Sequence, residues 1–305
     1  MITARSQRVG MIGLGRMGLP ICRRLTAAGF AVVATDVADA RRADARDAGA
    51  GWADGAAAVA ARADVVITVL PGPAEVVAVI EDVTGGMVPG SIWIEMSTAS
   101  PPVARRTAAA AAARGVRVLD APVGGAPAAA ADGRLLSFVG AHADDLEAVR
   151  DVLATLAGRI VHVGGPGSGY AVKLLANSLW FGQAVATAEA LTLARRAGLD
   201  LDVVRDALGA SAAAGRFLTD GVPALLAGDD LASFALARCC EQLESVLAFG
   251  DELAVPLELT ATVSDVHRAA LARYGPVDGE LLGARFVAER AGVSFGPGVT
   301  GPPSA

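Results

Sequence analysis

The fold is decided by residues 8–20, which read RVGMIGLGRMGLP. Residues 8–12 form a short apolar run typical of a buried strand, and a glycine-rich turn follows it directly. Residues 19–28 then have the pattern of a helix, and residues 31–35 have the pattern of a second strand. This order of elements predicts a βαβ unit whose first turn binds a dinucleotide.

Three glycines give that turn its expected chemistry. Gly13 permits the tight turn, Gly15 lets the backbone approach a pyrophosphate, and Gly18 lets the helix lie close to the strand. The N–H groups at the start of the helix can then bind phosphate oxygens. A glycine-rich turn without a ligand is the simpler alternative, but the position of this one between a strand and a helix favours the cofactor.

The end of the second strand indicates which cofactor is bound. Asp36 follows Gly18 by 18 residues, where a carboxylate can bind the ribose 2′-hydroxyl of NAD and would repel the 2′-phosphate of NADP. Arg41 and Arg42 stand farther along the chain and keep NADP open as the alternative. We therefore expect NAD, with NADP as the second choice.

Strands and helices continue to alternate up to residue 164. Further strands are expected at residues 64–70, 91–96, 116–119, 135–139 and 160–163. The first three of these stop in loops of small or polar residues, as expected where a ligand crosses the carboxyl ends of a doubly wound sheet. Ser100 is placed to cap a helix that has Pro101 in its first turn.

A long helix is expected over residues 169–196, because Ala and Leu dominate this stretch and Pro is absent from it. It is apolar on nearly every face, which predicts burial against several neighbours. Lys173 and Asn177 stand four residues apart and so share one face. A lysine in apolar surroundings needs a partner or a task, unless it reaches water from near the helix start.

Helical patterns fill the rest of the chain after the Gly-Gly-Pro-Gly stretch at residues 164–167. They are expected at residues 199–209, 221–226, 234–253, 257–273 and 280–291. The predicted fold is an α/β Rossmann-type domain over residues 1–165, then the long connecting helix and an all-α domain over residues 166–295 for substrate binding and dimer formation. Residues 296–305 are rich in Gly, Pro and Ser and are expected to be a disordered tail.

Composition narrows the classes of partner. The net charge of −6 argues against nucleic acid and anionic membranes as general partners. The apolar window at residues 174–194 contains Asn177, Gln183 and Glu189, which argues against a transmembrane helix. No signal-peptide pattern is present, and the three cysteines have no metal-binding spacing. A cytoplasmic protein without a metal site is expected.

These residues resemble the β-hydroxyacid dehydrogenase family, typified by 3-hydroxyisobutyrate dehydrogenase and related to 6-phosphogluconate dehydrogenase. The resemblance covers roughly residues 8–295. The matching motifs are Gly13-Leu14-Gly15-Arg16-Met17-Gly18-Leu19-Pro20, Asp120-Ala121-Pro122-Val123, and Gly167-Ser168-Gly169 followed by Lys173 and Asn177. The resemblance implies that Lys173 is the catalytic acid and base and that Asn177 orients the substrate. It also implies that Leu70, Pro71 and Thr98 line the cofactor site.

The substrate side departs from the family pattern. The family has Ser-Gly-Gly where this chain has Gly124, Gly125 and Ala126, so the serine hydroxyl that would bind the substrate carboxylate is missing. Glu241 stands in place of the family's lysine near the nicotinamide end of the cofactor site. We expect retained hydride chemistry, substrate binding by Gly124, Gly125 and Asn177, and a substrate pocket that is atypical at Gly124 and Glu241. The alternative is that backbone groups compensate for the changes.

The resemblance implies an NAD(P)-dependent oxidoreductase that moves a hydride between the nicotinamide and a β-hydroxyacid or semialdehyde-type substrate. One alternative is an imine reductase-like enzyme, since Glu241 suits a cationic substrate, although such relatives tend to replace the catalytic lysine. Another is a non-catalytic dinucleotide-binding protein, against which the presence of Lys173 and Asn177 speaks. The family's paired helical domains imply a homodimer or a higher homo-oligomer, with a small molecule as the other partner.

Overall fold

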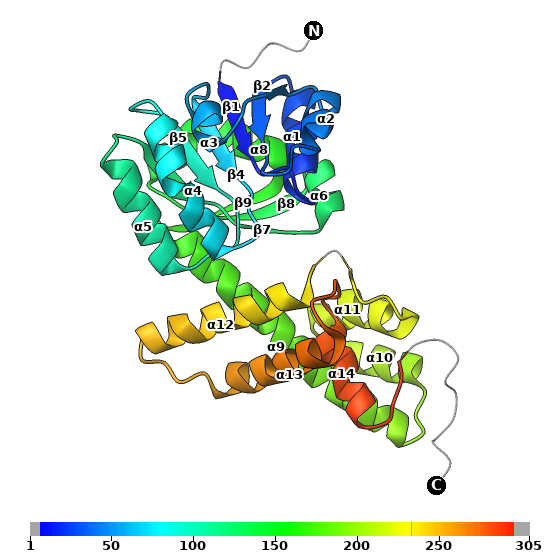
Figure 1. Ribbon diagram of the computed structural model, residues 1–305. Coiled ribbons are helices and arrows are strands. Elements are labelled where there is room, and N and C mark those ends of the chain that lie inside the picture. The colour runs from blue at the N-terminus through cyan, green and yellow to red at the C-terminus, as the bar shows by residue number, and fades with distance from the viewer. Residues whose placement is uncertain (1–6, 233, 296–305) are drawn as a thin grey trace. The chain divides into compact units, whose positions relative to one another are not determined.

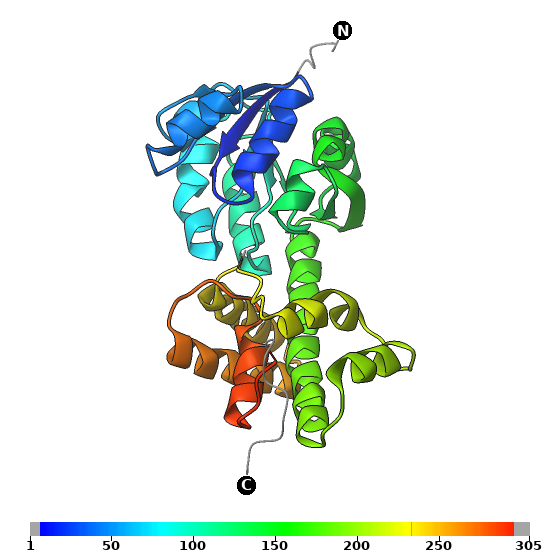
Figure 2. The ribbon, with the colours of Figure 1, turned by 90° about the vertical axis from the view of Figure 1, so that its right-hand side faces the viewer.

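The computed structural model describes residues 7–232 and 234–295. It divides the chain after Leu174 into two compact units, which we call the N-terminal unit and the C-terminal unit. The division lies within helix α9 (Ser168–Arg196), a helix of 29 residues that Figure 2 shows as one unbroken element. The domain boundary predicted at residue 165 stays a prediction, and the predicted tail at residues 296–305 lies outside the described residues.

The N-terminal unit is built on one sheet (Figure 1). Its strands are β1 (Arg8–Ile12), β2 (Ala31–Thr35), β3 (Gly51–Trp52), β4 (Val65–Thr68), β5 (Ile92–Glu95), β6 (Arg117–Asp120), β7 (Val123–Gly124), β8 (Leu135–Gly140) and β9 (Ala157–Gly164). The first six are parallel in the order β3-β2-β1-β4-β5-β6, which is the Rossmann order and reverses between β1 and β4. β8 runs antiparallel to β6 and β7 and parallel to β9.

Helices cover both faces of this sheet. They are α1 (Gly18–Ala27), α2 (Arg41–Asp47), α3 (Ala56–Ala60), α4 (Pro73–Gly86), α5 (Pro101–Ala112), α6 (Pro127–Ala131), α7 (Ala143–Ala148) and α8 (Arg150–Leu156). Successive residues of β4 belong to different cores: Val65 and Ile67 pack with α1 and α8, and Val66 packs with α3 and α4. Since both faces are buried, the strand is a continuous apolar run, which is the signal that the sequence carries.

The predicted fold class is confirmed, and two local details of the N-terminal unit differ from expectation. Helix α4 begins at Pro73, where the sequence indicated only the end of a strand; proline fits the first turn of a helix. Ser100 does occupy the N-cap position of α5, but its side chain makes no capping hydrogen bond with the described residues. The prediction that it caps the helix through its hydroxyl is therefore wrong.

The C-terminal unit is helical, as predicted. Besides the second part of α9, it contains α10 (Leu201–Gly209), α11 (Arg216–Ala227), α12 (Leu236–Glu252), α13 (Glu258–Tyr274) and α14 (Leu282–Arg290). One core joins α9 to α11 and α14 through residues such as Leu191, Phe217 and Ala284, and a second joins α9 to α12 through Phe181 and Leu243. These cores orient α9 within the unit.

Helix α9 is less buried than its composition predicted. Leu191 is fully buried, whereas Leu175, Leu179 and Leu193 are 53%, 66% and 72% exposed. The predicted burial of α9 against several neighbours is confirmed, but the other described helices cover only part of its surface and leave these three leucines exposed. In the described parts of the chain, no helix is both long enough and apolar enough to span a bilayer.

Candidate active site

The glycine-rich turn lies where the strand order reverses, between β1 and β4. Gly13 has a φ of +93°, and a Cβ there would lie 2.3 Å from the carbonyl oxygen of Val69. The Gly13 N–H donates to the Thr35 carbonyl at 3.0 Å, which joins the turn to β2. A Cβ on Gly18 would lie 2.0 Å from the Gly13 carbonyl oxygen, so α1 can approach the turn only with glycine at both positions.

Gly15 stands in the open part of the same turn. A Cβ on Gly15 would meet none of the described atoms within 4 Å, and Gly15 and Arg16 are both exposed. Helix α1 starts after Met17, and within the described residues it has neither a side-chain cap nor an acid in its first turn. Leu14 is fully buried and anchors the turn. The turn therefore offers backbone N–H groups and the positive end of a helix dipole to an anion.

Asp36 is half-buried at the end of β2 and contacts the glycine turn directly. Its Oδ2 accepts a hydrogen bond from the Leu14 N–H at 2.7 Å, and its Oδ1 accepts one from the Ala38 N–H at 2.9 Å. Each carboxylate oxygen can accept a further hydrogen bond. The structure thus places the acid next to the glycine turn, which is the position predicted for a ribose-binding acid.

The two arginines that left NADP open are both engaged in ion pairs. Arg41 pairs with Asp44 at 2.9 Å, and Arg42 pairs with Asp54 at 2.6 Å. The Arg42 guanidinium also lies 5.3 Å from the ring centroid of Trp52, whose indole N–H donates to Asp54. A 2′-phosphate would have to compete with these carboxylates for either arginine.

Leu70, Pro71 and Thr98 lie at the carboxyl ends of β4 and β5. The Leu70 N–H donates to the Ser97 hydroxyl at 2.8 Å, and Leu70 Cδ2 would lie 3.2 Å from a Cβ on Gly13. Pro71 is exposed, and Leu70 and Thr98 are half-buried. The N-terminal unit therefore brings the predicted cofactor residues from β1, β2, β4 and β5 to one edge of the sheet.

Glu95, at the end of β5, is a buried carboxyl that sequence reasoning missed. It is 1% exposed and accepts hydrogen bonds from the Thr68 hydroxyl at 3.2 Å, the Ser97 N–H at 3.0 Å and the Tyr170 hydroxyl. Burial raises its pKa to about 7, against the effect of its donors. An acid that ends an otherwise apolar strand was the available signal in the sequence.

Asp120, at the end of the neighbouring strand β6, is 4% exposed and contacts the start of α9. Its carboxylate accepts hydrogen bonds from the N–H groups of Gly167 at 2.6 Å and Tyr170 at 2.9 Å. Burial raises its pKa to about 6, although the backbone donors lower it. A cavity of about 10 Å³ beside Glu95, Asp120 and Tyr170 is too small for an organic substrate. The carboxylate therefore caps the start of α9.

Lys173 and Asn177 occupy successive turns of α9. Lys173 is half-buried in the N-terminal unit, one turn after Tyr170. Asn177 is half-buried in the C-terminal unit, and its Nδ2 donates to Oε1 of Gln242 in α12. Gln242 is buried, and its contact with Asn177 was not foreseen because the two residues are 65 positions apart.

Gly124 and Glu241 are the two positions at which the substrate side departs from the family pattern. Gly124, in β7, is half-buried, and a Cβ there would lie 3.8 Å from Leu136 Cβ, an ordinary contact. Packing therefore does not exclude a serine at this position. Gly125 has a φ of +119°, which favours glycine. Glu241, one residue before Gln242, pairs with Arg238 at 2.5 Å, so its charge is partly balanced.

Family models match most of the chain. The NAD binding domain of 6-phosphogluconate dehydrogenase matches residues 8–164, and the NAD-binding domain of NADP-dependent 3-hydroxyisobutyrate dehydrogenase matches residues 167–281. The chain belongs to the β-hydroxyacid dehydrogenase family. This β-hydroxyacid dehydrogenase is accordingly an NAD(P)-dependent oxidoreductase acting on CH–OH groups.

Individual relatives agree with this membership. The chain is 32% identical to 2-(hydroxymethyl)glutarate dehydrogenase of Eubacterium barkeri, over 88% of this chain and 90% of the relative. The structure of Mycobacterium tuberculosis 3-hydroxyisobutyrate dehydrogenase with L-serine matches with a TM-score of 0.86 at 28% identity, covering 94% of this chain and 99% of that one. An imine reductase from Myxococcus stipitatus matches with a TM-score of 0.63, over 93% and 100% of the two chains, but at 21% identity it shows the fold alone.

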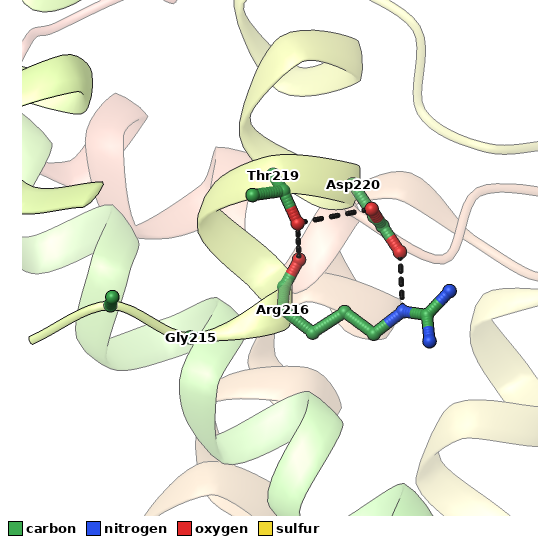
Figure 3. A pocket seen from close by; sticks show the side chains of 5 residues that line it. Gly215, Arg216, Thr219 and Asp220 are labelled. Carbon is green, nitrogen blue, oxygen red and sulfur yellow. Dashed lines mark hydrogen bonds and ion pairs between the residues drawn. The ribbon is translucent and has the colours of Figure 1, made fainter. Parts of the chain in front are cut away.

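A shallow recess of about 460 Å³ beside the start of α11 is drawn in Figure 3. Its polar side chains satisfy one another, since Arg216 pairs with Asp220 at 2.6 Å and the Thr219 hydroxyl lies 3.1 Å from Asp220. Among the described residues, no three His, Cys, Asp or Glu side chains lie close enough together to bind a metal ion.

Proposed function

We propose that this dehydrogenase interconverts a β-hydroxyacid and the corresponding semialdehyde, with Lys173 as the general acid and base. The observation that carries the proposal is that Lys173 is the only lysine in the chain, in which the other 25 of 26 Lys and Arg residues are arginines. Arginine cannot lose its proton near neutral pH, whereas a lysine in a suitable environment can. A positive charge is supplied by arginine everywhere else in the chain, so the single lysine at this position points to a proton-transfer role.

The residues would divide the work as follows. The glycine turn and the start of α1 hold the pyrophosphate, and Asp36 holds the adenosine ribose. NAD(P) bound there would supply the hydride chemistry. Lys173 takes the hydroxyl proton in oxidation and returns it to the carbonyl oxygen in reduction. Asn177 orients the substrate oxygen; its bond to Gln242 occupies one amide hydrogen and leaves a second N–H and the amide oxygen for the substrate.

We propose NAD as the preferred cofactor. Asp36 lies beside the glycine turn, and both nearby arginines are paired with carboxylates. A 2′-phosphate would meet the Asp36 carboxylate without an available arginine to balance it. The ratio of kcat/KM for NAD to that for NADP, measured with one substrate, tests this preference.

We propose that the substrate pocket is atypical at Gly124. Loss of the serine hydroxyl removes one hydrogen bond to a charged group, a contact worth about 1.5–3 kcal/mol. Because the structure leaves room for a side chain at Gly124, the variant Gly124→Ser restores the family residue without a clash. If the missing hydroxyl sets the preference, the variant gains about tenfold or more in kcat/KM for small hydroxyacids over other substrates.

We propose that a second copy of the chain covers the exposed leucines of the C-terminal unit. Leu175 and Leu179 on α9 and Leu259 on α13 are 53–72% exposed, and the Ser178 and Thr260 hydroxyls, 3.2 Å apart, bring these two helices together. Large apolar side chains exposed on neighbouring helices are a common sign of a protein interface. Light scattering at micromolar concentration should show a dimer or a larger oligomer, and a monomer there would contradict the proposal.

The decisive experiment follows nicotinamide absorbance over a panel of substrates: hydroxyacids with the oxidised cofactors NAD and NADP, and semialdehydes and cyclic imines with NADH and NADPH. Lys173→Ala should lower turnover by about 100- to 10,000-fold while leaving the dissociation constant of the cofactor nearly unchanged. Lys173→Arg is the matched variant, since it keeps the charge but not a transferable proton. Undiminished turnover in either variant would remove Lys173 from the mechanism, and turnover of imines alone would overturn the substrate class.

A further inference from the structure

Two buried carboxyls of the sheet contact the start of α9. Glu95 and Asp120 are register partners on the parallel strands β5 and β6, at the carboxyl end of each strand. Partners in register point to the same face of a sheet, so both carboxyls meet the helix together. They are 1% and 4% exposed.

Asp120 fixes the backbone of that turn. It accepts from Gly167 at 2.6 Å and Tyr170 at 2.9 Å, and these are N–H groups that the helix itself cannot satisfy. The approach is close: a Cβ on Gly140 would lie 2.6 and 2.7 Å from the two Asp120 oxygens and 2.7 Å from the Gly169 nitrogen. A Cβ on Gly169 would lie 2.5 Å from the Phe138 carbonyl oxygen. The helix start thus sits directly against the sheet backbone.

Tyr170 is held at both ends. Its N–H donates to Asp120 and its hydroxyl donates to Glu95, and the side chain is 1% exposed. Glu95 is fixed in turn by Thr68, whose hydroxyl accepts from the Trp93 indole N–H at 2.8 Å. A chain of hydrogen bonds therefore runs from the core of the sheet to the turn that precedes Lys173.

We propose that Asp120, Glu95 and Tyr170 are positioning residues that set the rotation and height of α9 and so place the Lys173 amine. The proposal rests on the proposed role of Lys173. Asp120 holds the backbone N–H groups of the helix start, and Glu95 holds the side chain of Tyr170. Together these contacts restrain rotation of α9 about its axis and sliding along it. A displacement of about 1 Å in a catalytic group costs about 100-fold in rate, so this restraint is a kinetic requirement as well as a structural one.

The test disturbs the carboxylate without touching a residue of the active site. Gly140→Ala crowds both the Asp120 carboxylate and the Gly169 nitrogen and so displaces the start of α9 from the sheet, whereas Gly165→Ala, near the same helix start, meets none of the described atoms within 4 Å and is the matched control. Because the chain has one lysine, protein labelled with [¹³C]lysine gives one side-chain Cε resonance, which reports directly on Lys173. Kinetics and cofactor affinity are measured on the same samples.

We expect Gly140→Ala to shift the Lys173 resonance and to lower kcat by about 10- to 100-fold, with the NADH dissociation constant unchanged. Tyr170→Phe, which loses only the bond to Glu95, should show the same pattern more weakly, and Gly165→Ala should match the wild type. An unmoved resonance with normal kcat in Gly140→Ala overturns the proposal. So does a parallel fall of kcat, cofactor affinity and melting temperature in both variants, since that would indicate a role in stability alone.

Failure of this proposal is distinguishable from failure of the proposed function. If Lys173→Arg remains active, Lys173 is not the proton-transfer group and the proposed function fails first. If Lys173→Arg is inactive while Gly140→Ala and Tyr170→Phe are both normal, the proposed function stands and the positioning role is wrong.

Discussion

Two helices begin at the carboxyl edge of the same sheet, and their starts differ. Helix α1 starts beside the open Gly15 with neither a cap nor an acid in its first turn, among the residues the structure describes. Helix α9 starts against the carboxylate of Asp120, which accepts two of its N–H groups. Both helix starts have N–H groups that the helix itself cannot satisfy, and both carry the positive end of a helix dipole.

The difference shows how one physical property serves two purposes. A helix start left open can bind an anion from solution, which suits the pyrophosphate of NAD(P). A helix start closed by an internal carboxylate cannot bind such an anion, but it is fixed to the sheet. We have proposed that in this dehydrogenase the first arrangement serves cofactor binding and the second serves the placement of Lys173.

The largest expected effect comes from giving the α1 start a carboxylate of its own. Gly15→Asp has room for its side chain and places a negative charge where the pyrophosphate would bind. Two like charges about 4 Å apart repel by about 4 kcal/mol at an effective dielectric of 20, so NADH should bind at least about 100-fold more weakly. Fluorescence titration of NADH measures the change.

A matched control separates charge from position. Gly165→Asp introduces the same side chain at an equally open glycine and should leave NADH affinity unchanged. If Gly15→Asp binds NADH like the wild type, the α1 start is not the phosphate site, and the contrast between the two helix starts has no functional meaning.

The next effect is on stability and concerns the α9 start. Asp120→Ala leaves the half-buried N–H of Gly167 and the buried N–H of Tyr170 without their acceptor, which should lower the free energy of unfolding by about 3 kcal/mol. Urea denaturation measures it. Asp132→Ala, which breaks the exposed ion pair with Arg134, should change it by less than about 1 kcal/mol. Equal losses in the two variants would mean that the Asp120 contact is no stronger than a surface pair.

The sequence predicted the open helix start but not the closed one. The glycine turn is local, since Gly13, Gly15 and Gly18 fall within six residues and their spacing alone implies the chemistry. The contacts at α9 join residues 47 and 75 positions apart, namely Asp120 to Gly167 and Glu95 to Tyr170. Asn177 and Gln242 are 65 positions apart. Such pairs depend on which strands become neighbours, which no periodicity in a single sequence specifies.

A third prediction uses pH to change the charge beside α9. Burial raises the pKa of Glu95 to about 7 from its ordinary 4.5, so the folded state binds a proton that the unfolded state has lost. The stabilisation is complete below the unfolded pKa and is lost as pH rises through the folded one. The free energy of unfolding should therefore fall by about 2 kcal/mol between pH 5 and pH 8 on account of this group.

The variant Glu95→Gln isolates that contribution, because glutamine does not titrate and its amide oxygen can still accept from Thr68 and the Ser97 N–H. Urea denaturation at several pH values should give a shallower fall in stability for the variant than for the wild type. Parallel pH profiles of stability for the two proteins would show that Glu95 titrates as an ordinary exposed acid.

The smallest expected effect concerns the preference for NAD over NADP at the open helix start. Arg42 lies near Asp36 in sequence but is paired with Asp54 at 2.6 Å and stacked on Trp52. Asp54→Asn should release it toward a 2′-phosphate and raise the ratio of kcat/KM for NADP to that for NAD by about two- to fivefold, since an exposed ion pair is worth at most about 1 kcal/mol. Asp47→Asn removes the same charge from the weaker pair with Arg46 at 3.6 Å and should leave the ratio unchanged. If Asp54→Asn and Asp47→Asn have equal NADP/NAD ratios of kcat/KM, the pairing of Arg42 has no effect and Asp36 alone sets the preference for NAD.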